Sequence, residues 1–126
     1  MLQLSGNCGA AGEDFAASLL RRKGYEILCR NYHSRYGEID IIARNSEYLV
    51  FAEVKTRDEN YQVSPLEAVT AGKQKKIYKT ALLYLQSNPT PLQPRFDVIA
   101  IVMKPDRRTV GSAEHIENAF TRGGYY

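Results

Sequence analysis

The chain has 126 residues, enough for one compact domain, and its composition, 44% hydrophobic and 25% charged, is typical of a soluble globular protein. Seventeen basic and fourteen acidic residues give a net charge of +3, which permits a polyanionic partner without requiring one. Two cysteines without metal-ligand spacing, no secretory pattern and no membrane-length apolar run argue against a disulfide scaffold, a zinc ribbon, secretion and membrane insertion, so we expect a reduced, cytoplasmic setting.

The first half of the chain predicts one helix and three strands. Apolar residues recur at helical spacing over residues 10–23, and Gly24 follows three basic residues as a C-terminal cap. Three segments are rich in β-branched and aromatic residues, as strands are: 25–30, 37–43 and 48–55. We expect the last two to form a hairpin. Apolar residues on both of its faces predict a sheet that is covered on both sides.

Two helix starts follow in the second half. Ser64, Pro65 and Glu67 have the spacing of a capping box with proline at the first helical position, which predicts a short helical turn. Thr70 begins a longer helix that we expect to reach about Gln86. Four apolar residues of this helix should face inward: Ile77, Ala81, Leu82 and Leu85.

The remaining segments complete the fold prediction. Residues 95–103 predict a buried strand, and residues 115–120 a weaker last element. The order α-β-β-β-α-β combines a local hairpin with crossover connections, which indicates a single-domain α/β fold with one mixed β-sheet flanked by helices. We expect that domain to cover residues 1–121 and a disordered tail to cover residues 122–126.

Three charged residues interrupt the apolar strands of the hairpin: Asp40, Glu53 and Lys55. Burying an ionisable group costs on the order of several kcal/mol unless it is paired or binds an ion. Glu53 and Lys55 are two residues apart and so share a face of their strand. If residues 46–47 form the turn, positions whose numbers sum to 93 lie opposite each other, and Asp40 faces Glu53 with β-carbons about 5 Å apart.

Two facing carboxylates repel each other unless a cation lies between them. Hard oxygen donors without a Cys or His cluster favour Mg²⁺ or Mn²⁺, with water and a substrate phosphate completing the coordination. Such a site suits phosphodiester hydrolysis, in which Lys55 would orient the attacking water, neutralise developing charge or act as a base. The alternative is a solvated cross-strand network of Glu53 and Lys55 at a sheet edge.

The segment GEIDIIARNSEYLVFAEVKTR resembles the core of the PD-(D/E)XK nuclease superfamily, which includes restriction endonucleases and archaeal Holliday-junction resolvases. The whole chain is similar to the YraN-like family of small bacterial proteins. An ordered set of motifs carries this resemblance: Gly12-Glu13, Gly24-Tyr25, Arg30-Asn31, and residues 37–40, 50–55, 67–69, 95–98 and 118–120.

The resemblance implies a restriction-endonuclease-like fold and a role for each matching position. Asp40 and Glu53 match the metal-binding acids, and Lys55 matches the catalytic lysine. Glu13 matches the first-helix glutamate that completes or supports the metal site in resolvase-like members, although an acid at a helix start has a simpler explanation in the helix dipole. Ile39 stands where the superfamily's name has proline. Resolvase-like relatives pair two sites, so a homodimer is also implied.

Two basic zones are candidates for binding a nucleic-acid backbone, with ordinary solvated surface as the alternative for both. The first zone is a helix shoulder: Lys73, Lys75, Lys76 and Lys79. The second is interleaved with Tyr32 and Tyr36, whose rings could stack on unpaired bases. Its basic residues are Arg21, Arg22, Arg30 and Arg35.

Other charged residues have less specific interpretations. We expect Glu38 to face away from the metal site and to form a salt link. His33 and His115 are interpreted as surface or packing residues. Asp97, inside a strand, is interpreted as a structural partner of Arg95 or of another core donor.

The sequence thus predicts an Mg²⁺- or Mn²⁺-dependent endonuclease that cleaves DNA, including branched or otherwise structured DNA. Its expected catalytic residues are Asp40, Glu53 and Lys55, and its expected metal ligands are Asp40, Glu53 and Glu13. The alternative hypothesis is a binding module with the same fold, which would hold nucleic acid or dock a protein without turnover.

Overall fold

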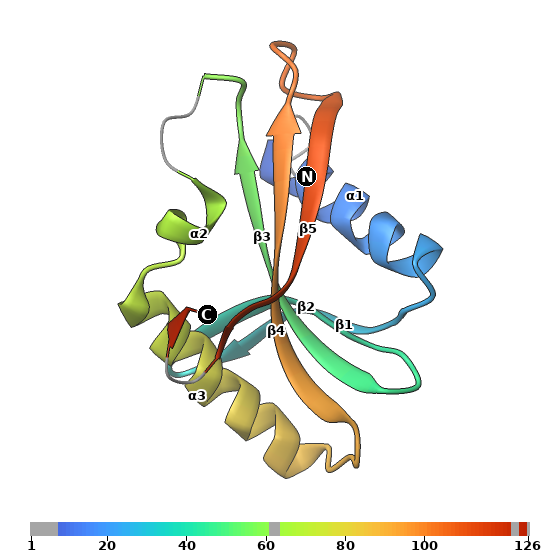
Figure 1. Ribbon diagram of the computed structural model, residues 1–126, viewed down its shortest axis with the longest axis vertical. Helices are drawn as coiled ribbons and strands as arrows, with labels where there is room; N and C mark the ends of the chain where they lie inside the picture. Colours follow the sequence, from blue (N-terminus) through green and yellow to red (C-terminus); the bar gives the residue numbers. More distant parts are fainter. Residues whose placement is uncertain (1–7, 61–63, 122–123, 126) are drawn as a thin grey trace.

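The computed structural model describes residues 8–60, 64–121 and 124–125 (Figure 1). Its helices are α1 (Cys8–Arg22), α2 (Pro65–Ala68) and α3 (Ala71–Ser87). Its strands are β1 (Glu26–Ser34), β2 (Gly37–Arg44), β3 (Tyr48–Arg57), β4 (Gln93–Met103), β5 (Val110–Thr121) and β6 (Gly124–Tyr125). Within the described ranges, no helix has both the length and the apolar character that a membrane crossing needs.

The strands form one mixed sheet in the order β1-β2-β3-β4-β5-β6. Neighbouring strands are antiparallel except β3 and β4, which run parallel from Tyr48↔Gln93 to Arg57↔Val102. A tight turn cannot join parallel strands, so the chain returns from the end of β3 to the start of β4 through α2 and α3. The protein is therefore a single α/β domain with a mixed sheet, as predicted.

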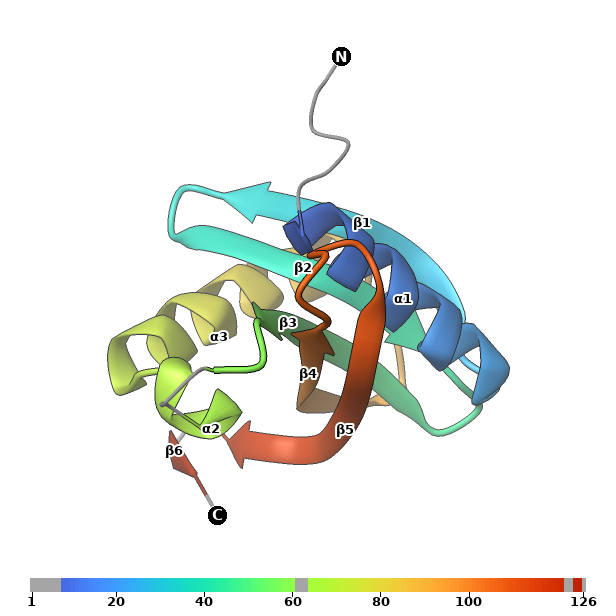
Figure 2. The same ribbon diagram turned by 90° about the horizontal axis from the view of Figure 1, so that it is seen from above.

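Helices cover both faces of this sheet, with α1 on one side and α3 on the other (Figures 1 and 2). The core on the α1 side includes Leu20, Ile41 and Ile99. The core on the α3 side includes Phe51 and Ile77. The prediction of a sheet covered on both sides is confirmed, and any side chain on β2 or β3 must lie in one of these two layers.

Local sequence signals fix the ends of the helices. Gly24 follows α1 with a φ of +94°, a conformation that glycine adopts without strain. Ser64 and Glu67 form the reciprocal hydrogen bonds of a capping box at α2. The Thr70 side chain accepts a hydrogen bond from the backbone N of Lys73 at 3.3 Å, which fixes the start of α3 and places Lys73 in its first turn.

The inward face of α3 differs in part from the prediction. Ile77 and Ala81 are buried, but Leu82 is 42% exposed. Thr80 and Gln74 are buried instead. The Thr80 Oγ1 and Ser34 Oγ atoms are 2.7 Å apart, and Gln74 Nε2 donates to the carbonyl of Val69 at 3.0 Å. These hydrogen bonds allow α3 to bury polar side chains, an outcome that hydrophobic spacing does not predict.

The strands β1 and β5 are longer than predicted. Each lies at or near an edge of the sheet, where exposed polar residues weaken the alternation that marks a strand. Part of the segment expected to be a disordered tail, Gly124–Tyr125, pairs with the end of β5 as β6. Residues 122, 123 and 126 lie outside the described part of the chain.

Candidate active site

The β2–β3 hairpin has the predicted register. Its backbone pairing runs from Arg44↔Leu49 to Ile41↔Ala52, and in each pair the residue numbers sum to 93. Asn45 closes the turn, because its Oδ1 accepts hydrogen bonds from two following backbone amides at 2.9 and 2.7 Å. The turn therefore determines which residue of β3 each residue of β2 faces, up to the point where the strands separate.

The strands separate at Asp40, one residue beyond the last pair. Asp40 Oδ2 accepts a hydrogen bond from the backbone N of Val54 at 2.7 Å, so a side chain replaces a backbone partner there. Ile39 lies in the core under α3 and Ile41 in the core under α1, although residues two apart on a regular strand share a face. The alternation of β2 is broken at Asp40, whose carboxylate lies between the diverging strands. We call this place the fork.

Glu53 and Lys55 lie on the β3 side of the fork. The Lys55 Nζ and Glu53 Oε2 atoms are 3.2 Å apart, and the two side chains are only 12% and 11% exposed. Lys73 reaches the same oxygen from α3, with its Nζ 3.5 Å from Glu53 Oε2. The predicted common face of Glu53 and Lys55 is confirmed, and two ammonium groups share one carboxylate oxygen.

Lys73 was expected only as part of a basic helix shoulder. The structure brings it into the site, because the N-cap at Thr70 puts it in the first turn of α3, from which its Nζ reaches Glu53 on β3. The capping pattern of Thr70 was visible in the sequence. The sequence did not show that the crossover brings α3 to this part of the sheet.

The electrostatics of the fork centre on Asp40. Burial, together with the nearby Glu53 carboxylate, raises the pKa of Asp40 to about 7, although the hydrogen bond from the Val54 amide acts in the opposite direction. The two acids therefore resist being ionised together in this partly enclosed place. This is the repulsion predicted for two carboxylates that face each other.

The pKa values of the two lysines in the site shift in opposite directions. Burial, followed by the hydrogen bond with Lys73, lowers the pKa of Lys55, against the attraction of Glu53. The hydrogen bond with Lys55 raises the pKa of Lys73, helped by the charge of Glu53 and opposed by partial burial. Lys73 is thus the stronger holder of its proton, and Lys55 is the better proton acceptor of the pair.

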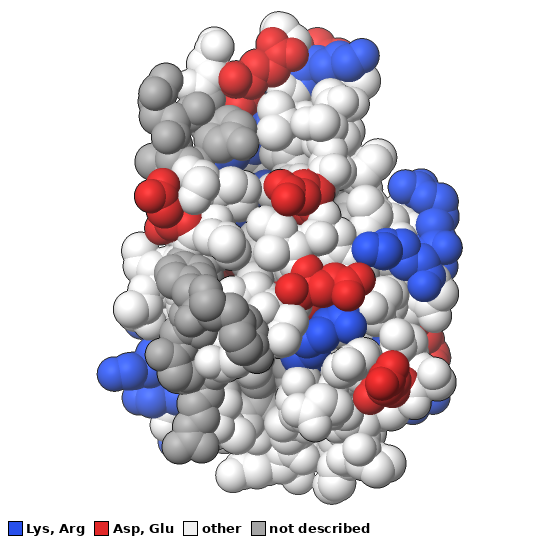
Figure 3. All heavy atoms as spheres, in the orientation of Figure 1, with Lys and Arg blue, Asp and Glu red and all other residues white. Residues whose placement is uncertain are grey.

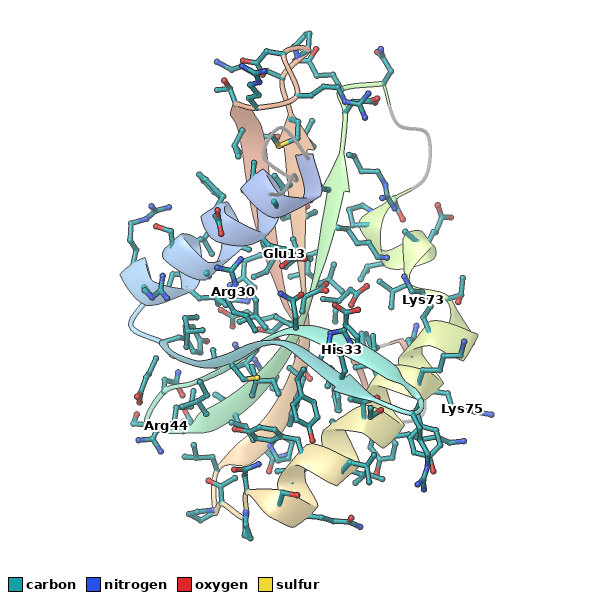
Figure 4. All side chains as sticks on the ribbon, turned by 180° about the vertical axis from the view of Figure 1, so that it is seen from behind. Glu13, Arg30, His33, Arg44, Lys73 and Lys75 are labelled. Atoms are coloured by element: carbon teal, nitrogen blue, oxygen red, sulfur yellow. The ribbon has the colours of Figure 1, made fainter. Side chains whose placement is uncertain are left out.

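Glu13 approaches the fork from the α1 side. Gly12 lets the helix pack closely on β3, since a β-carbon there would clash with Thr56 Oγ1. Arg30 holds Glu13 across a distance of 3.7 Å (Figure 4). Burial raises the pKa of Glu13 against this attraction, and the charge of Glu13 contributes to the raised pKa of Asp40. Glu13 thus acts on the charge of Asp40 from the opposite layer, and its support of a metal site stays a prediction.

A cavity of about 300 Å³ opens beside the fork, and the lining residues include Asp40, Glu53 and Lys73. Glu38 also lines it, so the prediction that Glu38 faces away from the site is wrong. Residues two apart on a strand share a face, so the regular alternation of β2 would already have placed Glu38 with Asp40. The expected salt link of Glu38 is a contact of 3.8 Å between its Oε1 and His33 Nδ1.

Two carboxylate side chains beside this cavity, Asp40 and Glu53, could hold a metal ion. Both offer hard oxygen donors, the type that Mg²⁺ and Mn²⁺ prefer. Over the described residues, no three His, Cys, Asp or Glu side chains converge as a complete metal cage. A cation there would need water or substrate oxygens to fill its coordination shell.

The predicted nucleic-acid-binding residues fall into separate groups. Arg21 and Arg22 lie in the last turn of α1, and the guanidinium of Arg22 lies over the Phe15 ring. Arg30 is paired with Asp14 at 2.9 Å and with Glu13. Figure 3 shows basic side chains at the end of α1, over α3 and at the β4–β5 turn as distinct patches.

The remaining predicted residues lie on α3 and at the β1–β2 turn, and only some of them reach the cavity. Lys76 lines it together with Lys73. Arg35 lies at the tip of the β1–β2 hairpin, with its Nη2 donating to the Tyr36 hydroxyl at 3.0 Å. Lys79 Nζ is 5.2 Å from the centroid of the Tyr36 ring. Lys75 is exposed and points away from the fork (Figure 4).

A second buried charge cluster lies under α1, outside the site. Arg95 donates to both carboxylate oxygens of Asp97 at 2.9 and 2.8 Å, and Asp97 is fully buried. His115 Nε2 lies 2.7 Å from Asp97 Oδ2, while its Nδ1 lies 2.7 Å from Lys23 Nζ. The ammonium can only donate, so His115 Nε2 carries the proton toward Asp97. The structural interpretation of Asp97 and the packing interpretation of His115 are confirmed.

A larger cavity of about 530 Å³ lies at the start of β4, and its lining includes Tyr48, Arg95 and Phe96. The guanidinium of Arg95 is already held by Asp97 and by the hydroxyl of Tyr25 at 2.6 Å. Among the described residues that line this cavity, there is no acid–lysine group of the kind found at the fork. The chemistry-bearing residues are therefore at the smaller cavity.

Comparison with known proteins finds one family. Residues 12–101 match the uncharacterised protein family UPF0102, and this range extends from Glu13 through Lys73 to β4. A UPF0102 protein of Caldanaerobacter subterraneus subsp. tengcongensis is 45% identical over 113 residues, which cover 89% of this chain and 93% of the relative.

Relatives from other bacteria are equally similar. A UPF0102 protein of Syntrophomonas wolfei is 44% identical over 113 residues, covering 89% of this chain and 96% of the relative. One from Chlorobium phaeobacteroides is 49% identical over 117 residues, covering 89% and 92% of the two chains. These similarities extend over nearly the whole domain, including the fork.

Proposed function

This chain belongs to the UPF0102 family, and we propose that it is a metal-dependent endonuclease that hydrolyses phosphodiester bonds in DNA, including branched or otherwise structured DNA. One observation carries the proposal: Asp40, Glu53 and Lys55 meet at the fork, beside a cavity that is open to a ligand. The same residue types occur in the same order in the PD-(D/E)XK core that the sequence resembles, and this supports membership of that superfamily.

Asp40 and Glu53 would hold Mg²⁺ or Mn²⁺, with Glu13 supporting the site electrostatically from the α1 side. When bound, such an ion polarises a phosphoryl oxygen and lowers the pKa of a bound water. The fit rests on the donor set and on the repulsion between the two acids, which a divalent cation would relieve. The cavity leaves room for substrate oxygens next to both carboxylates.

Lys55 would handle the proton of the attacking water. Its pKa is lowered by burial and by Lys73, so it can accept a proton more readily than an exposed lysine. If it stays charged, the same ammonium can orient the water and neutralise negative charge on the phosphate. Because its Nζ is 3.2 Å from Glu53 Oε2, the lysine is held in place for either role.

A binding module without turnover is the second candidate, and one observation favours it. The ammonium groups of Lys55 and Lys73 already lie within 3.2 and 3.5 Å of Glu53 Oε2, so the charge of Glu53 is balanced without a metal. If the protein is a binding module, the ion pairs at the fork have a structural role. The surrounding basic residues would then hold a nucleic acid, or the surface would dock a protein.

Metal-dependent cleavage distinguishes the two candidates. Wild-type protein would be incubated with junction, flap, single-stranded and duplex DNA, with Mg²⁺, with Mn²⁺ or with a chelator. The enzyme proposal expects cutting that the chelator abolishes and that Asp40→Asn and Lys55→Gln reduce by at least about a hundredfold. Arg108→Ala, which removes an exposed charge at the β4–β5 turn, is the matched control and should cut normally.

Cleavage that survives both substitutions would rule out the fork as the active site. Binding of DNA without cutting under any metal would favour the module. Two-strand cutting would further require two copies of the site, so we propose a homodimer as the active unit, to be tested by light scattering with and without DNA.

A further inference from the structure

Three lysines follow one another along α3 from the fork to the β1–β2 hairpin: Lys73, Lys76 and Lys79. Residues three apart on a helix are neighbours on its surface. Lys73 and Lys76 line the cavity beside the fork, and Lys79 lies over the ring of Tyr36. Together with Arg35 and Tyr36 at the hairpin tip, these lysines form what we call the basic strip.

The hairpin tip and α3 are joined, so the basic strip is one continuous surface. The Ser34 and Thr80 hydroxyl oxygens are 2.7 Å apart. A β-carbon added to Gly37 would lie 3.6 Å from the β-carbon of Lys76, which places the backbone of the tip directly against the helix. The surface between the carboxylates and Tyr36 is therefore formed by two elements that contact each other.

Lys73 is paired with Glu53 at 3.5 Å, but the other cations of the basic strip are not paired with the described acids. Arg30 and Arg44, elsewhere on the surface, are held in ion pairs at 2.9 and 3.1 Å. In the ranges that the structure describes, neither Lys76 nor Lys79 has an acid within ion-pair distance. Arg35 instead contacts Tyr36, with its guanidinium 4.9 Å from the ring centroid. The strip therefore offers cations without an acid partner, two of which, Lys79 and Arg35, lie over the Tyr36 ring that a base would share with them.

We propose that the basic strip binds one unpaired nucleic-acid strand, with Lys73 at the phosphate next to the carboxylates and a base at the Tyr36 ring. Successive lysines can follow successive phosphates, and an aromatic side chain can stack on a base only when that base is not stacked in a duplex. The cavity of about 300 Å³ at the start of the strip is large enough for a sugar and a phosphate.

This inference rests on the proposed function for the position of the cleaved phosphate and adds the substrate class. The preferred substrate has a single-stranded segment beside the cleavage point, as in a flap or an opened junction arm. Tyr36 determines this specificity, whereas Lys76 and Lys79 contribute affinity for any backbone.

The test measures binding separately from cleavage. Fluorescence anisotropy would follow a labelled single strand, a flap and a blunt duplex of the same sequence, with Asp40→Asn as the common background so that the DNA stays intact. Tyr36→Ala, Tyr36→Phe and Lys76→Ala would be compared with Arg108→Ala, a charge-matched control at the β4–β5 turn. Thermal unfolding of each variant would verify that it is folded.

Tyr36→Ala should raise the Kd for the single strand and the flap by about 5- to 100-fold, the range of one lost stacking contact, and should leave duplex binding nearly unchanged. Tyr36→Phe should retain binding. Lys76→Ala should weaken binding to every DNA and reduce the slope of log K against log salt by about 0.7 on the single strand. Arg108→Ala should match the background protein.

Equal losses on single strand and duplex for Tyr36→Ala, or an equal loss for Arg108→Ala, would overturn the inference. Saturable binding of an acidic peptide in place of DNA would overturn it as well. If the binding pattern holds but wild-type protein never cuts, the endonuclease proposal fails and the basic strip stands. If wild-type protein cuts and the Tyr36 and Lys76 variants bind normally, only the strip is rejected.

Discussion

Asp40 Oδ2 lies 2.7 Å from the backbone N of Val54, where a regular hairpin would place a backbone carbonyl. This one hydrogen bond links the separation of β2 from β3 to the position of an acid in the site. It satisfies an amide that the fork would otherwise leave without a strand partner. Structure and chemistry at this point therefore depend on the same side chain.

Replacing Asp40 by asparagine should change how stability depends on pH. Burial and Glu53 raise the pKa of Asp40 from 3.8 to about 7. The folded protein therefore holds this proton more tightly than the unfolded chain, and its free energy of unfolding should fall as the pH rises from about 4 to about 7. Above that range, Asp40→Asn should be more stable than wild type, by on the order of a few kcal/mol.

Urea denaturation between about pH 5 and pH 9 would measure this difference. Asparagine keeps an oxygen that can accept from the Val54 amide, so the comparison isolates the charge. Glu114→Gln, at an exposed position on β5, is the control and should follow the wild-type curve. Parallel curves for wild type and Asp40→Asn would contradict the raised pKa.

Removing the charge of Lys73 should raise the pKa of Lys55. The pKa of Lys55 is lowered by burial and then by Lys73, and only the second effect disappears in Lys73→Gln. Carbon-13 methylation of the lysines, followed by an NMR titration, would report the change directly. Lys75→Gln, two residues along the same helix, should leave the titration of Lys55 in place. An unchanged titration in Lys73→Gln would show that burial alone sets the pKa.

Two helical glycines should respond to alanine in opposite directions. Gly12→Ala places a methyl group against Thr56 Oγ1 and should destabilise the protein by about 1–3 kcal/mol, despite the better helix propensity of alanine. Gly72→Ala meets only an ordinary contact of 4.0 Å and should be neutral or stabilising by up to about 1 kcal/mol. Chemical denaturation would measure both.

Thr56→Ala should recover part of the loss in the Gly12→Ala background, because it removes the hydroxyl that obstructs the methyl group. The resulting double-mutant cycle would have a favourable coupling energy. Additive effects would mean that α1 can move away from β3 without cost. In that case Glu13 would not be held near the fork by helix packing.

Asp97→Ala should destabilise the protein by about 3–5 kcal/mol at neutral pH, since it leaves Arg95 buried without its partner. Although burial acts against ionisation, hydrogen bonds from His115, Arg95 and the Asn118 amide lower the pKa of Asp97. Its contribution should therefore be complete above about pH 4 and disappear at lower pH as the folded protein takes up the proton.

Denaturation at several pH values would test this, with Glu114→Ala as the exposed control. If the loss of unfolding free energy in Asp97→Ala stays the same below about pH 4, the network contributes by packing and not by charge.

The sequence predicted the hairpin best, because the Asn45 turn fixes its register locally. The predicted register therefore correctly put Asp40 near Glu53. The sequence did not predict the fork, since a broken alternation arises from how β2 fits between two cores. Glu38 was predicted to face away from the site, although it is two residues from Asp40 and a regular strand puts both on one face.

The role of Lys73 was also beyond sequence reasoning. Its place in the first turn of α3 follows from the capping pattern at Thr70, but its contact with Glu53 depends on a crossover between distant segments. The length of β5 was underestimated because most of its side chains are exposed and polar. Tertiary packing decided each of these features.

The parallel pairing of β3 with β4 has a consequence for how the protein is made. On the ribosome, the hairpin that carries Asp40 and Glu53 emerges before α3 and well before β4. Pairing across so long a connection is a slow, non-local event in folding. Lys55 lies on the same strand as Glu53 and can pair with it from the start, whereas Lys73 reaches Glu53 only when α3 docks on the sheet. The working site would therefore be completed after its hairpin has formed.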